Sequence, residues 1–96
     1  MPLAIFSLEG CRRETPAARG RTVFEEQCAS CHSTGRDRKL GSGLYGIFGW
    51  RALGNGKDMN EQNLRQLIIK GVPNMPPFAN LTPQQMDDLI AYLKTF

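Results

Sequence analysis

Histidine is nearly absent from this sequence, and its apolar segments are short. Among the 96 residues there is one histidine, His32, and no apolar run reaches the roughly 18 residues that a membrane-spanning helix needs. The sequence therefore predicts no spanning segment. The net charge of +3 is also small, so it gives no indication of nucleic-acid binding.

Cysteine is sparse as well, with three residues, Cys11, Cys28 and Cys31. An odd number, with two cysteines so close together, argues against a disulfide framework, because a bridge that closes a very short loop constrains the unfolded chain little. A chain of this length buries only roughly 60 to 65% of the surface that it exposes when unfolded. We therefore expect the cysteines to have a chemical role, and a metal or a large cofactor to add stability.

A first helix is expected to begin at Thr22, because Glu25 three residues later completes a capping-box pattern. The helix should continue into the cysteine pair. Phe24, Cys28 and Cys31 then follow the spacing i, i+4 and i+7, which predicts that both thiols share a helical face with an aromatic ring.

Two further helices have clear start or stop signals. One should begin near Asn60 and end at Gly71. The last has Thr82 as its cap, Pro83 at its first position and Gln85 completing a capping box. The apolar faces predicted for these two helices consist of Leu64, Leu67 and Ile68, and of Met86, Leu89, Ile90 and Leu93.

The connecting segments are rich in glycine and proline. Residues 40–56 contain six glycines, and residues 72–78 contain three prolines. No strand-like alternation and no internal repeat is present. These segments also carry many large apolar side chains, so we expect them to cover a buried flat object or a common core.

The segment QCASCHS, residues 27–33, places Cys28 and Cys31 directly before the only histidine. A C-x-x-C-H sequence is typical of a c-type haem site, in which both cysteines form thioethers to the porphyrin and the histidine binds iron. A zinc site would need four ligands, and the only other thiol is Cys11. A thioredoxin-like pair would need a βαβ context. We therefore favour covalent haem over a zinc site, a redox dithiol or a chance match.

Residues 20–96 resemble a class I cytochrome c, a small all-α domain of three or more helices around one covalently bound haem. Gly20 and Phe24, followed by CASCH, are similar to the family's N-terminal helix, and LIAYLKT resembles the C-terminal helix that crosses it. The segment GSGLYGIFG, residues 41–49, resembles the loop after the proximal histidine. MPPF, residues 75–78, resembles the loop that carries a distal methionine.

The resemblance implies that His32 and Met75 are the two axial ligands of the iron. The chain has no second histidine, and Met75 lies in a loop stiffened by three prolines. Met86 belongs to the apolar face of the last helix, Met59 stands at a helix start and Met1 at the chain end. The alternative is that Met75 only fills the core.

One position departs from the family pattern. Ser42 stands where the family usually has proline, whose carbonyl accepts a hydrogen bond from the proximal histidine. Serine keeps the carbonyl, so we expect this bond to persist in a more flexible loop. Tyr45 in the same loop is expected to contact the cofactor. Trp50 and Arg51 are candidate donors to a haem propionate, the alternative being a core tryptophan and a surface arginine.

A haem with both axial positions filled predicts one-electron transfer and no enzymatic activity of its own. The expected partners are redox proteins in transient complexes with a monomer, and Arg36, Arg38 and Lys39 are candidates for steering an acidic one. Two alternatives remain open at this point. One is a ligand-binding or sensor haem protein with a labile Met75, and the other is a cytochrome module of a larger oxidoreductase.

Residues 1–19 are interpreted as a leader, and residues 20–96 as the cytochrome domain. The segment MPLAIFSLEGC is interpreted as the remnant of a signal sequence, as the end of a lipoprotein signal with Cys11 lipidated, or as a leader with a spare thiol. The resemblance implies a periplasmic or other extracytoplasmic location. A lipid on Cys11 would add membrane association.

Overall fold

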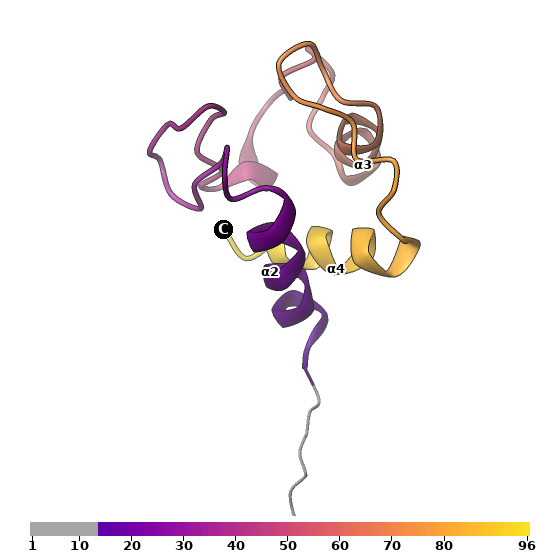
Figure 1. Cartoon of the computed structure of the whole chain (residues 1–96). Coiled ribbons are helices and arrows are strands. Elements are labelled where there is room, and N and C mark those ends of the chain that lie inside the picture. Colours follow the sequence, from indigo (N-terminus) through magenta and orange to yellow (C-terminus); the bar gives the residue numbers. More distant parts are fainter. Residues whose placement is uncertain (1–13) are drawn as a thin grey trace, which may run out of the picture.

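Three α-helices and one short 3₁₀ turn make up the regular structure of residues 14–96, the residues that this computed structural model describes (Figure 1). The helices are α2 (Pro16–Gln27), α3 (Glu61–Lys70) and α4 (Pro83–Leu93), and the turn is η1 (Ile47–Gly49). Extended pairing in this part of the chain is limited to isolated bridges. The predicted all-α fold is confirmed. No helix between residues 14 and 96 combines the length and apolar character needed to cross a bilayer.

Helix α2 begins earlier than the sequence pattern indicated. Thr15 is its N-cap, with the side-chain oxygen accepting a hydrogen bond from the Ala18 amide at 3.1 Å, and Pro16 opens the first turn. Thr22 lies inside the helix and is exposed, so the predicted start at Thr22 is wrong. Glu25 does not complete a capping box there, because its carboxylate pairs with Arg21 on the preceding turn.

The end of α2 also differs from the prediction. The helix ends at Gln27, and Cys28 is its C-cap with φ near −120°. From there the chain turns sharply: the Cys28 carbonyl accepts hydrogen bonds from the amides of Cys31 at 3.1 Å and His32 at 2.9 Å. The two thiols therefore do not share one helical face. They lie on a turn that places the histidine directly after the helix.

The predicted limits of α3 and the predicted start of α4 are confirmed. Asn60 caps α3, and its side-chain oxygen accepts a hydrogen bond from the Asn63 amide at 2.7 Å. Gly71 ends this helix with φ of 73°, a conformation that favours glycine. Thr82 and Gln85 exchange side-chain-to-backbone hydrogen bonds of 3.0 and 2.9 Å, which is the complete capping box expected for α4.

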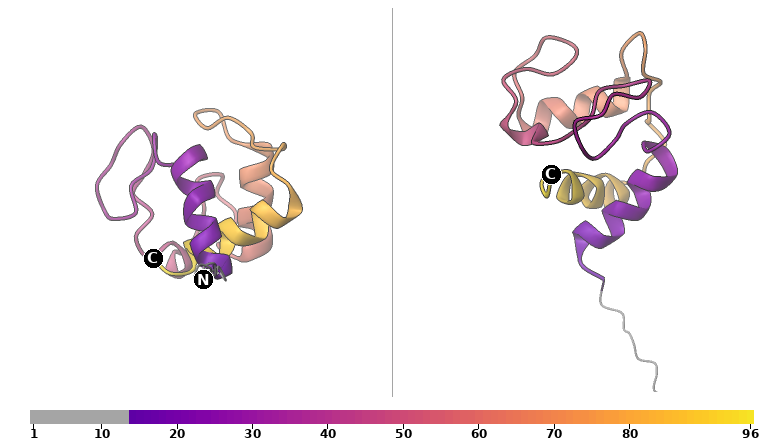
Figure 2. Two further views of the ribbon diagram at one scale, coloured as in Figure 1. Left: turned by 60° about the horizontal axis from the view of Figure 1, so that its bottom comes forward. Right: turned by 90° about the vertical axis from the view of Figure 1, so that its left-hand side faces the viewer.

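Helices α2 and α4 cross in close contact, as the two views of Figure 2 show. The crossing point is Gly20, where a Cβ atom would collide with the Asp88 carbonyl and lie 2.8 Å from the Tyr92 Cβ atom. Beside it, the rings of Phe24, Tyr92 and Phe96 form three edge-to-face pairs with centroid separations of 4.9 to 5.8 Å. Each such pair contributes about 0.5 to 1.5 kcal/mol beyond area burial.

A buried ion pair joins the same two helices. The Asp88 side chain is only 5% exposed, and its carboxylate accepts two hydrogen bonds from the Arg19 guanidinium at 3.0 and 3.2 Å. Gln84 donates a third at 2.9 Å. Because a buried carboxylate without partners is costly, these three donors explain how α4 carries an acid on its buried side.

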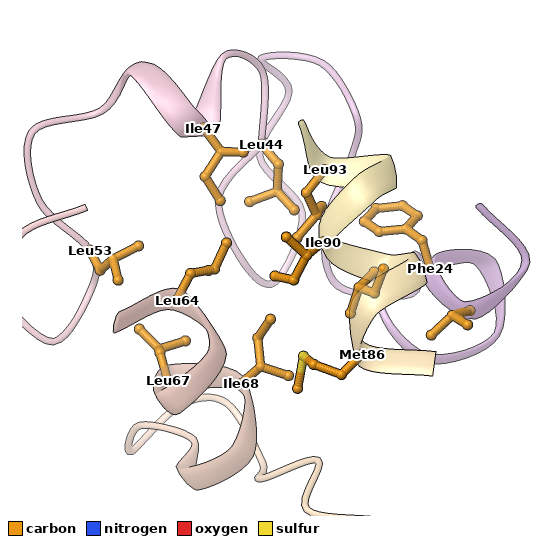
Figure 3. Close-up of a cluster of buried hydrophobic side chains, with 12 residues drawn as sticks. Phe24, Leu44, Ile47, Leu53, Leu64, Leu67, Ile68, Met86, Ile90 and Leu93 are labelled. Carbon is orange, nitrogen blue, oxygen red and sulfur yellow. The ribbon is translucent and has the colours of Figure 1, made fainter. Parts of the chain in front are cut away.

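The hydrophobic core lies between α3 and α4 and extends to α2 and the loops. In Figure 3, Leu64 and Ile68 of α3 point toward Met86 and Ile90 of α4. Burial of each such side chain contributes about 1.5 to 3 kcal/mol. The core contains all the side chains predicted for the apolar faces of α3 and α4, and in full it consists of Val23, Phe24, Leu44, Ile47, Leu53, Leu64, Leu67, Ile68, Met86, Leu89, Ile90 and Leu93.

Candidate functional site

The candidate site residues come from two loops on one side of α4. The loop that follows α2 and the loop between α3 and α4 both lie on the side of α4 where α3 is found (Figures 1 and 2). The first contains the CASCH turn, and the second contains Met75. Cys28 and Met75 are partly buried, and both pack against the hydrophobic core.

His32 is oriented by the backbone carbonyl of Ser42. Its Nδ1 atom lies 2.8 Å from that oxygen in a partly buried contact. Because a carbonyl oxygen only accepts hydrogen bonds, Nδ1 carries the proton here. In the neutral imidazole the other ring nitrogen, Nε2, then has the free lone pair, which is the form that binds a metal. The change from proline to serine at position 42 leaves this contact in place.

Gly41 packs directly against the same imidazole. A Cβ atom at this position would lie 2.8 Å from Nδ1 and 3.0 Å from Nε2 of His32, so a side chain would displace the ring. The Gly41 amide donates to the Cys31 carbonyl at 2.7 Å, and the Lys39 ammonium donates to the Ala29 carbonyl at 2.7 Å. Residues 39–41 thus stabilise the CASCH turn through hydrogen bonds to two of its carbonyl groups. The sequence alone did not indicate this role for residues 39–41. The only feature that could have indicated it is the glycine directly before Ser42.

The two thiols are free and partly buried. Cys28 and Cys31 form no disulfide. Burial raises the pKa of the Cys28 thiol to about 11, with a smaller contribution from the neighbouring Cys31. Both sulfurs are therefore present as unlinked side chains beside the oriented imidazole.

Met75 lies in a short turn of defined geometry. Its amide and carbonyl both pair with the backbone of Val72, at 2.8 and 3.1 Å. Gly71 precedes this turn with φ of 73°, and a Cβ atom there would press on the Met75 carbonyl. Of the other methionines in residues 14–96, Met86 is fully buried in the core, whereas Met59 is partly buried against it.

The other residues that were predicted to contact the haem lie in the loop after His32. The indole N–H of Trp50 donates to the Tyr45 carbonyl at 3.2 Å. Tyr45 is 53% exposed, and the Arg36 guanidinium lies 4.2 Å from the centroid of its ring. Contact between Tyr45 and the cofactor stays a prediction. Arg51 is exposed. For Trp50 and Arg51, contact with a propionate stays a prediction.

This donor set fits a c-type haem. Two free thiols lie on a turn that ends in an imidazole, the Nδ1 atom of the imidazole contacts a backbone carbonyl, and a glycine packs against the ring. Met75 is partly buried, and a hydrogen-bonded turn holds it in the loop between α3 and α4. The all-α fold and this set of side chains define a small c-type cytochrome domain.

Comparison with known proteins identifies the family. The sequence profile described as cytochrome C oxidase, cbb3-type, subunit III matches residues 15–93, so the chain belongs to this family of c-type cytochrome domains. The protein is therefore an electron-transfer haem protein, and its cofactor is covalently bound haem c.

Individual relatives are of two kinds. The chain is 40% identical over 81 residues to a cytochrome bc1 complex cytochrome c subunit of Corynebacterium diphtheriae, covering 81% of this chain and 26% of that protein. It is 35% identical over 79 residues to a cytochrome c-553-like protein of Synechocystis, covering 82% and 68%. A cytochrome c oxidase subunit 2 of Alkalihalophilus pseudofirmus is 34% identical over 89 residues, covering 85% and 26%. The chain thus spans about a quarter of the length of the complex subunits.

Proposed function

We propose that this chain carries single electrons on one haem attached through Cys28 and Cys31, with His32 and Met75 as the axial ligands. The observation that supports this proposal most strongly is the 2.8 Å contact between His32 Nδ1 and the Ser42 carbonyl, because it leaves Nε2 as the metal-binding nitrogen. When bound, the haem supplies a one-electron couple between ferric and ferrous iron.

The side chains and loops have separate tasks in this proposal. The two thiols fix the ring to the turn after α2, and Gly41 with the Ser42 carbonyl holds the imidazole plane. The backbone hydrogen bonds between Val72 and Met75 fix the turn from which the Met75 thioether would bind the iron as the second ligand. With both axial positions filled by protein, no iron position is open to a substrate, so the domain acts as a carrier and has no enzymatic activity of its own.

The relatives support a place for this carrier in a respiratory assembly. Proteins named as subunits of the bc1 complex and of cytochrome c oxidase contain a stretch similar to this chain. We therefore propose that the domain exchanges electrons with a membrane oxidoreductase at an extracytoplasmic surface. A leader that ends before Thr15 and a lipid on Cys11 belong to the same proposal, although positions 1–13 lie outside the described residues. Residues 15–19, which the sequence assigned to the leader, form the cap and first turn of α2. Mass spectrometry of the mature protein tests the lipid: an unmodified Cys11 contradicts it.

Optical spectroscopy tests the axial ligands. The protein is produced with the haem-attachment machinery, reduced, and recorded before and after addition of carbon monoxide. We expect a low-spin spectrum that carbon monoxide leaves unchanged. Met75→Leu should open the iron to carbon monoxide, whereas Met59→Leu, the matched control, should behave as wild type. Rapid carbon monoxide binding by the wild type would favour a ligand-binding or sensor protein, and absence of haem would contradict the proposal.

A further inference from the structure

Positive charge is distributed unevenly over residues 14–96. On the helices, Arg19, Arg21 and Arg65 each pair with a carboxylate, and Lys94, the C-cap of α4, pairs with Glu61. Between residues 33 and 57 there are five cations and one carboxylate, and none of these groups forms an ion pair within the described residues. They are Arg36, Asp37, Arg38, Lys39, Arg51 and Lys57. Most of the uncompensated positive charge therefore lies in the loops, and Lys70 at the end of α3 is the one unpaired cation on a helix of the described residues.

Exposed apolar side chains gather in the same region. Only three large ones are found among the described residues, and two of them, Leu40 and Tyr45, lie in the segment 36–45, which we call the basic loop. Leu40 is 83% exposed and directly follows Arg38 and Lys39. An exposed leucine next to unpaired cations is not explained by packing within this chain.

The basic loop is held in shape by its own contacts. The amide of Tyr45 donates to the Gly35 carbonyl at 3.1 Å, and the Arg36 guanidinium stacks on the Tyr45 ring. A backbone bridge joins Arg38 to His32, which ties the loop to the proposed proximal ligand. The surface is thus ordered before any partner binds, which lowers the entropic cost of docking, and it lies directly beside the turn proposed to hold the haem.

The composition of this surface favours a protein partner. Arginine and tyrosine are enriched where protein interfaces concentrate binding energy, and an exposed leucine fits an apolar depression. Attraction to anionic lipid usually requires four to eight clustered cations, whereas the basic loop has three and also carries Asp37. Unpaired cations steer an oppositely charged partner and increase the rate of association.

We propose that the basic loop docks an acidic redox protein, with Leu40 entering an apolar depression on that partner. This inference depends on the proposed electron-transfer function, for which it names the docking surface. One electron passes between the haem iron and the partner's redox centre, whose oxidation state changes by one in the opposite direction, and no bond forms or breaks.

Stopped-flow kinetics with a defined probe tests the proposal. The ferric holoprotein is mixed with the fully reduced form of an acidic flavodoxin, whose anionic flavin hydroquinone becomes the neutral semiquinone as the haem becomes ferrous. We expect the double variant R36E/R38E to lower the second-order rate constant by about tenfold or more at low ionic strength, a difference that high salt removes. Leu40→Asn should lower the rate at every ionic strength, because its effect is not electrostatic.

The matched control reverses two unpaired charges outside the basic loop. K57E/K70E changes the net charge equally, and within residues 14–96 neither lysine forms an ion pair. Its effect should be clearly smaller than that of R36E/R38E. Equal effects of the two double variants would mean that only net charge matters, and would overturn the proposal. The proposal would also be overturned if R36E/R38E lost binding to phosphatidylglycerol vesicles but reacted with flavodoxin at the wild-type rate.

Optical spectra and reduction potentials separate this inference from the proposed function. If wild type and variants share one low-spin spectrum and one potential, but R36E/R38E reacts with flavodoxin as fast as wild type, the docking surface is wrong and the carrier function stands. If no reversible one-electron couple is found in the wild type, the proposed function itself fails.

Discussion

The Nδ1 atom of His32 lies 2.8 Å from the carbonyl oxygen of Ser42, so the backbone of the following loop fixes the orientation of the imidazole. Gly41, directly before that serine, packs against the same ring. Two consecutive residues therefore set both which ring nitrogen donates a hydrogen bond and the plane of the ring. Control of a ligand by its neighbours is a general way in which proteins adjust a metal centre.

Gly41→Ala should disturb this arrangement. The added methyl group would press on the His32 ring, and overpacking of this kind typically costs about 1 to 3 kcal/mol of stability. We also expect a changed reduction potential, measured by redox titration of the holoprotein. Gly54→Ala is the control, because a Cβ atom there meets nothing within 4 Å. Equal potentials for wild type and Gly41→Ala would contradict the contact.

Gly71→Ala should loosen the Met75 turn. Gly71 and Gly56 both have positive φ, 73° and 84°, so alanine strains the backbone at either position by about 1 to 2 kcal/mol. Only at Gly71 does the added Cβ atom press on the Met75 carbonyl. Carbon monoxide should therefore bind faster to the reduced Gly71→Ala protein than to Gly56→Ala, as flash photolysis or rapid mixing can measure. The same rate in both would mean that Gly71 does not position Met75.

Two threonine variants test where α2 begins. Thr15→Ala removes the N-cap and should lower the free energy of unfolding by about 1 kcal/mol. Thr22→Ala replaces an exposed residue inside the helix and should leave stability unchanged or raise it by a few tenths of a kcal/mol, about the difference in helix propensity. Denaturant titration distinguishes the two. A larger loss at Thr22 would restore the start that the sequence pattern indicated.

Acid should weaken the contact between α3 and the end of α4. Hydrogen bonds from Lys94, at 2.9 Å, and from Arg65, at 2.8 Å, hold the pKa of the Glu61 carboxyl below its ordinary value. A lowered folded-state pKa contributes stability above the unfolded value of about 4.3, and this contribution is lost as the pH falls through the folded pKa. Glu61→Gln should reduce the dependence of stability on pH in that acid range, as denaturant titrations at several pH values can measure.

Glu26→Gln, at an exposed residue with no ion pair in residues 14–96, is the control. An unchanged acid slope in Glu61→Gln would contradict this assignment.

Local signals in the sequence predicted the parts of the fold that are locally determined. Asn60 and the Thr82–Pro83 pair begin their helices as expected, because a cap requires only neighbouring residues. The same Thr-Pro pattern occurs at Thr15, where α2 begins, whereas the capping-box pattern at Thr22 indicated a start inside the helix. Exposed residues within a helix can also have the capping-box spacing seen at Thr22 and Glu25. That spacing by itself therefore does not locate the start of a helix.

Contacts between distant residues were beyond prediction. Asp88 had the appearance of a surface residue on a helix, yet Arg19, 69 positions earlier in the chain, holds it in a buried pair. The exposed ring of Tyr45 and its stacking with Arg36 likewise depend on how the loop closes. The residues proposed for the haem, by contrast, form a contiguous motif and a proline-rich loop, and the resemblance to class I cytochromes c indicated both.

Nuclear magnetic resonance of the ferrous holoprotein with ¹³C-methyl-labelled methionine tests the central claim most directly. A methyl group bound through its sulfur to the iron lies over the porphyrin and is shifted far upfield by the ring current. We predict one such signal among the four methionines, and its loss in Met75→Leu but not in Met59→Leu. An upfield signal that persists in Met75→Leu, or no such signal in the wild type, would contradict ligation by Met75.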